Sequence, residues 1–128
     1  MRRVLLCLIL ALLLAACRQS AQPTATPATA VDIDLLVEPT PITTGEAALV
    51  ITLRAADGTP IDGASVSVRG DMNHAGMVPV LGETSASENG VYRVPFEFTM
   101  RGDWIITVTA ALPGGGETAE VFDLSVRS

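Results

Sequence analysis

The pattern of hydrophobic and polar positions divides the 128-residue chain into three stretches. Residues 4–16 form an unbroken apolar run, and residues 18–30 are rich in Thr, Ala, Pro and Gln without any period. From Val31 onward, apolar and polar residues alternate in short runs. Alternation with a period of two is typical of strands that bury one face, so the third stretch is the folded domain.

The alternating runs are separated by turn signals as far as the C-terminus. Asp-Gly and Asn-Gly pairs, which favour tight turns, stand between several of them. The predicted strands are residues 31–37, 47–55, 64–68, 77–81, 91–98, 104–110 and 119–126. Seven short strands in about 98 residues, with no helical period, predict an all-β fold, an immunoglobulin-like β-sandwich of about seven antiparallel strands.

The N-terminus has the pattern of a secretory signal peptide. Arg2 and Arg3 precede an apolar run of 13 residues, shorter than the ~20 residues that a membrane-spanning helix needs. The run ends in Leu-Ala-Ala-Cys at positions 14–17, which resembles the bacterial lipobox, in which the cysteine is lipidated and becomes the first residue. The alternative is an ordinary signal cleaved after a small residue, which would leave Cys17 as a free thiol.

These segments predict the organisation of the chain. We expect a lipoprotein signal peptide at 1–16, a lipidated Cys17 with a flexible linker at 17–30, and the sandwich at 31–128. The linker composition cannot bury enough apolar surface to fold, so its expected role is spacing. The expected localisation is the cell envelope, extracytoplasmic and anchored to a membrane through lipid.

Composition narrows the classes of function. Without Arg2 and Arg3, six arginines face 14 acidic residues, a balance of −8, and the chain contains no lysine. An acidic balance argues against nucleic acid, because phosphate binding needs a basic face. We expect no enzymatic activity, because no base–nucleophile pair and no redox-active cysteine pair remain after export.

The residues left for chemistry are three methionines and the single histidine. Met72, His74 and Met77 lie within six positions of one another. Thioether sulfur and imidazole nitrogen are soft to intermediate donors, a combination that favours copper(I) over hard cations. On a strand, Met72 and His74 would project from the same face roughly 7 Å apart.

Two further conditions complete this candidate site. Met77 would point away from His74 on a straight strand, so a turn or bulge at Ala75-Gly76 is needed to bring it round. Met100 precedes a tight turn and is the expected fourth ligand, provided that this turn and the Met72–Met77 segment lie at the same end of the sandwich.

Plain packing is the alternative use of these side chains. Methionine often fills irregular gaps in a core, and a lone histidine in a loop is often only solvated. The polar, turn-prone surroundings of Met72 and His74 favour the ligand interpretation. Trp104 is expected in the core, and as a neighbour of Met100 it would also be near the metal site, with its ring face available to a bound cation.

The block from Asp71 to Val108 resembles the YtkA-like and FixH-like domains of bacterial exported and membrane proteins. The resemblance rests on the Met/His segment followed by a proline, then GVYRVPFEF at 90–98 and MRGDWIITV at 100–108. It implies an immunoglobulin-like sandwich. Because several members are linked to copper handling or to the assembly of copper oxidases, it also implies a copper-transport or oxidase-assembly protein as partner. The single histidine indicates one site rather than several.

Two functions remain open at this point. The first is a lipid-anchored extracytoplasmic module that binds copper(I) and acts in copper handling or oxidase assembly. The alternative is a non-metal protein-interaction module that docks on a membrane-associated complex through a sheet edge or a loop. The expected metal ligands are Met72, His74, Met77 and Met100.

Overall fold

The computed structural model describes residues 30–74 and 76–127, so the expected signal peptide, Cys17 and nearly all of the linker lie outside the described residues. Every element in the described part is a strand, which confirms the predicted all-β class. No helix long and apolar enough to cross a membrane occurs among these residues. The strands are β1 (Val31–Glu38), β2 (Gly45–Ala55), β3 (Ser65–Met72), β4 (Val80–Thr84), β5 (Ser87–Glu88), β6 (Val91–Phe98), β7 (Gly102–Ala111) and β8 (Glu117–Val126).

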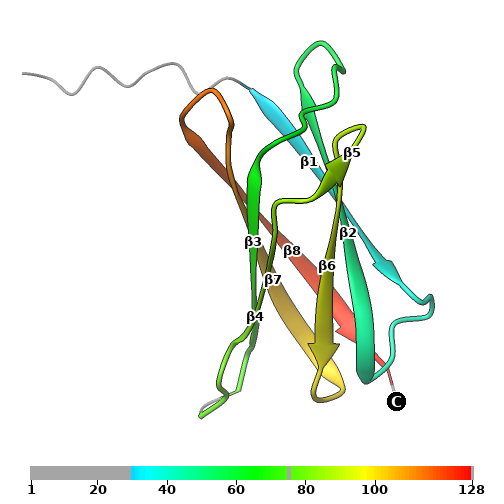
Figure 1. The fold of residues 1–128 in the computed structure, drawn as a ribbon. Helices are drawn as coiled ribbons and strands as arrows, with labels where there is room; N and C mark the ends of the chain where they lie inside the picture. The colour runs from blue at the N-terminus through cyan, green and yellow to red at the C-terminus, as the bar shows by residue number, and fades with distance from the viewer. Residues whose placement is uncertain (1–29, 75, 128) are drawn as a thin grey trace, which may run out of the picture.

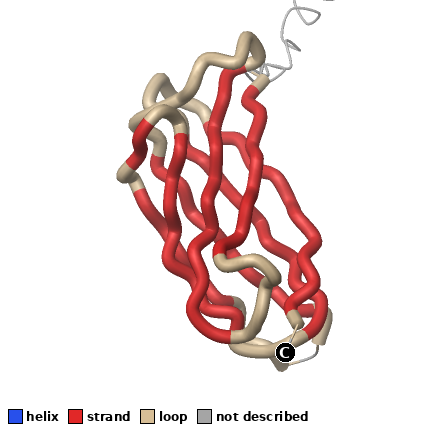
Figure 2. The backbone as a smooth tube through the Cα atoms, turned by 90° about the vertical axis from the view of Figure 1, so that its right-hand side faces the viewer, coloured by secondary structure: helices blue, strands red, loops and turns tan. Residues whose placement is uncertain are grey.

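The strands form two four-stranded antiparallel sheets, a first sheet in the order β1-β2-β6-β5 and a second sheet in the order β4-β3-β7-β8 (Figure 1). These orders match the ABED and C′CFG sheets of immunoglobulin-like sandwiches. The strands run along the length of an elongated body, with the loops gathered at its two ends (Figure 2). The predicted sandwich is therefore confirmed.

The core lies between the two sheets, because every second side chain of the inner strands points toward the opposite sheet. Along β3 and β6, buried and exposed positions alternate almost without interruption. Trp104 is only 1% exposed, which confirms its expected place in the core. Its ring meets Phe98 edge to face with centroids 5.3 Å apart, an arrangement that aromatic quadrupoles favour.

The largest differences from the prediction are in β3 and β4, and β5 is an eighth strand that the pattern did not predict. β3 continues to Met72 instead of ending at residue 68, although Gly70 interrupts the apolar pattern. A Cβ on Gly70 would fall 2.5 Å from Cζ of Phe96, so glycine is needed where this ring packs over the backbone. The fourth strand starts at Val80 instead of residue 77, since Pro79 has no N–H to donate to a ladder.

Candidate metal site at one end of the sandwich

The Met72–Met77 segment and the Met100 turn lie at the same end of the sandwich, as the four-ligand hypothesis requires. β3 ends at Met72, which is paired in register with Trp104 of β7. β7 begins at Gly102, two residues after Met100. In Figure 1 the β3–β4 loop and the β6–β7 turn are both at the lower end. We call this the methionine end, defined by Met72, His74, Met77 and Met100.

Met72 is the innermost of these side chains. It is 8% exposed and belongs to the buried cluster between the sheets. A Cβ on Gly102 would fall 3.1 Å from the terminal Cε of Met72. Gly102 has a φ of +128°, in the region that favours glycine, so the same residue allows the turn and leaves room for Met72.

The other three side chains lie progressively nearer to solvent. Met77 is half-buried and packs against the core, whereas Met100 is 45% exposed and His74 is exposed. The expectation that Met72 and His74 share one face of a strand is wrong, because β3 ends at Met72 and residues 73–74 form a bend. The donors thus extend from the core to the surface.

Trp104 links the core to the Met100 turn. Its indole Nε1 donates a hydrogen bond to the backbone carbonyl oxygen of Met100 at 2.9 Å. The indole N–H of a buried tryptophan needs such a partner. Because the ring is also packed against Phe98, this bond holds the Met100 turn against the sandwich. Contact between the ring face and a bound cation stays a prediction.

The donors at the methionine end differ from those of a carboxylate or cysteine site. Within 30–74 and 76–127, no group of three or more His, Cys, Asp or Glu side chains is placed to hold a metal ion. Asp71, beside Met72, is bound on the outer face by Arg69 through two hydrogen bonds of 2.8 and 2.9 Å. These bonds raise the pKa of Arg69 above its ordinary value. The available ligands are thioethers and one imidazole.

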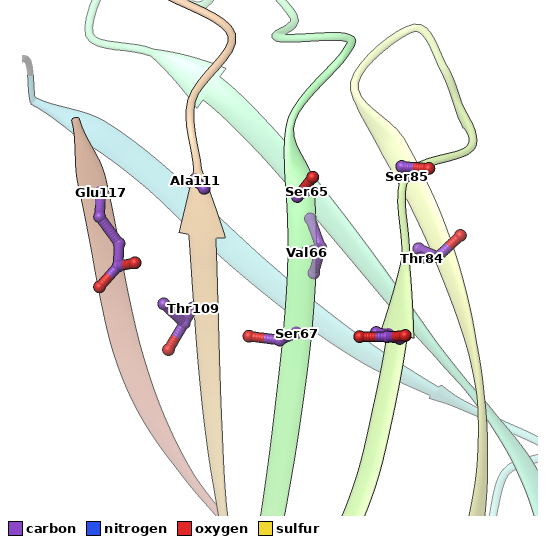
Figure 3. Close-up of a pocket in the computed structure, with 9 residues that line it drawn as sticks. Ser65, Val66, Ser67, Thr84, Ser85, Thr109, Ala111 and Glu117 are labelled. Carbon is purple, nitrogen blue, oxygen red and sulfur yellow. The ribbon is translucent and has the colours of Figure 1, made fainter. Parts of the chain in front are cut away.

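A second feature was not predicted from the sequence. The outer face of the second sheet carries two hollows, of about 450 and 460 Å³, which share Ser67, Glu83 and Thr109. Figure 3 shows Ser67 and Thr109 on neighbouring strands, with Glu117 on the next strand. The sequence feature that could have indicated it is the alternation of small hydroxyl residues at 65, 67, 107 and 109. Short side chains on one face of neighbouring strands leave a depression in the surface of the sheet.

Sequence comparison with known proteins identifies the family of the domain that carries the methionine end and the two hollows. A family model described as YtkA-like matches residues 26–109, more than half of the chain. The match runs from before β1 into β7 and includes the whole methionine end. No curated protein shows significant sequence similarity to the chain.

Proposed function

The chain belongs to the YtkA-like family, and from that premise we propose that it binds copper(I) at the methionine end. The ligands are Met72, His74, Met77 and Met100, with Trp104 beside them. The domain acts in copper handling or oxidase assembly, as a lipid-anchored module outside the cytoplasm. Its partner is a copper-transport or oxidase-assembly protein.

One observation carries this proposal: two segments far apart in sequence bring the histidine and all three methionines of the described residues to one end of the fold. Three thioethers and one imidazole suit a soft monovalent ion and suit hard cations poorly. Copper(I) is the cargo of this site. Its ligation needs side-chain donors alone, without a carboxylate or a thiol.

The graded burial of the ligands supports transfer rather than permanent storage. His74 and Met100 are accessible to an incoming or outgoing ion, while Met72 closes the inner side of the site. A partner's ligands can therefore replace the exposed donors first. The site opens to solvent without exposing the core, because Trp104 holds the Met100 turn in place.

The position of the tether supports the same role. Val31 is paired with Ala55, at the end of the sandwich where β2 finishes and β3 begins. Met72 lies at the other end of β3, so the chain from Cys17 enters the domain opposite the methionine end (Figure 1). The 13-residue linker spans up to ~40 Å when extended, so a partner can reach the methionine end at a distance from the membrane.

A competition titration tests the copper proposal. The full chain in neutral detergent is titrated with copper(I) against a chromogenic chelator, beside a Met72→Leu/His74→Ala/Met77→Leu variant. Leucine keeps the apolar volume, so the fold is retained. The wild type is expected to withdraw copper(I) from the chelator and the variant is not. Equal competition by the two proteins would rule out this site.

A separate experiment tests the anchor. Cys17→Ser is expected to abolish acyl labelling and to move the protein from the membrane fraction to the soluble fraction. A bacterial lipoprotein cysteine needs more than one acyl chain for stable anchoring, so labelling with a fatty acid analogue is the direct readout. A variant that stays membrane-bound, beside a wild type that takes up no lipid, would contradict the proposal.

A further inference from the structure

On the outer face of the second sheet, short side chains occupy the central strands and longer side chains stand on the strands at either side. Ser67 pairs in register with Thr109, and both line the two overlapping hollows. Ser65 and Thr107 continue this floor along β3 and β7. We call the floor and its flanks the trough. Its length along β3, from residue 65 to residue 69, is roughly 13 Å.

Exposed aliphatic side chains flank the trough on both sides. Leu81 on β4 and Val121 on β8 are 69% and 60% exposed. They lie in one cross-strand row, with Arg69 and Thr107 between them. Ile105 is also exposed on β7. Leu81 lines one of the hollows, and Val121 pairs in register with Thr107 at its edge. Large apolar side chains scattered singly are ordinary, but several of them beside one hollow are typical of an interaction surface.

Acidic side chains complete the flanks. Glu83 and Glu117 line the hollows, and the ion pairs of the described residues, Arg69–Asp71 and Arg93–Glu38, leave both of them without a cationic partner. Arg69 lies at one end of the trough, but the carboxylate of Asp71 neutralises it locally. The surface around the hydroxyl floor is therefore negative.

From this arrangement we infer that the trough docks a basic protein segment, extended in shape, that carries Lys or Arg beside aliphatic side chains. The cations would meet Glu83 and Glu117, and the aliphatic groups would cover Leu81 and Val121. A second copy of the chain meets the same acids in a two-fold contact and is repelled, as is an anionic membrane. The inference does not depend on copper(I).

The test uses the full chain in neutral detergent and a fluorescent peptide, Lys-Lys-Val-Val-Lys-Lys, which in extended form presents Lys, Val and Lys on each of its faces. Its extended length of about 20 Å covers the trough. Binding is followed by fluorescence anisotropy at low and at physiological salt. The basic peptide is expected to bind, and its counterpart with Glu in place of every Lys is not. Glu83→Gln/Glu117→Gln should weaken binding about three- to tenfold, as expected for two partly exposed ion pairs. Leu81→Ser/Val121→Ser should weaken it as well.

Matched variants on the first sheet separate docking from general attraction to an acidic protein. Asp32→Asn/Asp34→Asn removes the same charge from the outer face of β1, and Leu36→Ser removes an aliphatic group that is 56% exposed there. Both are expected to leave the affinity unchanged.

Four results would overturn the inference. The first is equal weakening by the variants of both sheets, and the second is equal binding of the acidic peptide. The third is a concentration-dependent dimer that Glu83→Gln/Glu117→Gln disrupts, because such a dimer would mean that the trough binds a second copy of the chain. Amide chemical shifts of Ser67 and Thr109 that stay fixed on peptide addition would contradict the location.

Discussion

The terminal methyl of Met72 lies against Gly102, so close that a Cβ there would be 3.1 Å from Met72 Cε. The last residue of β3 and the first residue of β7 are thus fitted to each other at the methionine end. The φ of +128° at Gly102 adds a conformational need for glycine. The buried methionine and the turn that carries Met100 therefore form one packed unit.

Gly102→Ala is expected to destabilise the domain by about 1–3 kcal/mol, because the backbone is strained and Met72 must shift. The measurement is urea unfolding followed by the fluorescence of Trp104, the single tryptophan of the chain. Gly114→Ala is the control, since a Cβ there meets nothing within 4 Å and its φ lies outside the left-handed region. Equal stability changes in the two variants would mean that Gly102 has no special role.

Tyr92 connects β6 to the chain between β2 and β3. Its hydroxyl donates to the carbonyl oxygen of Ile61 at 2.7 Å and accepts from the N–H of Ala64 at 3.0 Å. Tyr92→Phe leaves both backbone groups unpaired, and Ala64 is fully buried. We expect a loss of about 1–3 kcal/mol in the free energy of unfolding.

Ser125→Ala provides the comparison for Tyr92→Phe, because it removes an exposed hydrogen bond to Asp103. A surface change of this kind should alter the free energy of unfolding by less than about 0.5 kcal/mol. A Tyr92→Phe protein as stable as the Ser125→Ala protein would show that the Tyr92 hydroxyl does not hold the loop.

Glu46 and Glu97 lie directly opposite each other on β2 and β6, and both are exposed. Like charges at such positions repel, so Glu97→Lys is expected to stabilise the domain by about 0.2–1 kcal/mol, and less at high salt. Thermal unfolding at two ionic strengths measures this. Glu117→Lys, opposite Ala111, should bring no comparable gain. A Glu97→Lys protein no more stable than wild type at low salt would show that Glu46 and Glu97 do not repel each other measurably.

The period of the sequence predicts the fold better than it predicts the site. Alternation along residues 91–98 predicts β6 with the same bounds, because each inward side chain there is large and apolar. Gly70 breaks the pattern of β3, and only the ring of Phe96 from the other sheet explains its place in a strand. Such contacts are not visible in a local pattern.

The same limit applies to the candidate ligands. The residue types and the turn signals indicate a Met/His segment, but the burial of Met72 depends on Gly102, which is 30 positions further along the chain. Likewise, the exposure of His74 follows from the end of β3 at Met72. The trough depends on pairing Ser67 with Thr109, a register that the sequence alone leaves open.

X-ray absorption at the copper edge of the copper(I)-loaded full chain tests the central claim most directly, because it identifies the ligand atoms. We expect a shell dominated by sulfur with one nitrogen. The sulfur contribution is expected to disappear in a Met72→Leu/Met77→Leu/Met100→Leu variant. A shell of nitrogen and oxygen alone, or a spectrum that the three substitutions leave unchanged, would contradict copper(I) binding by the methionines.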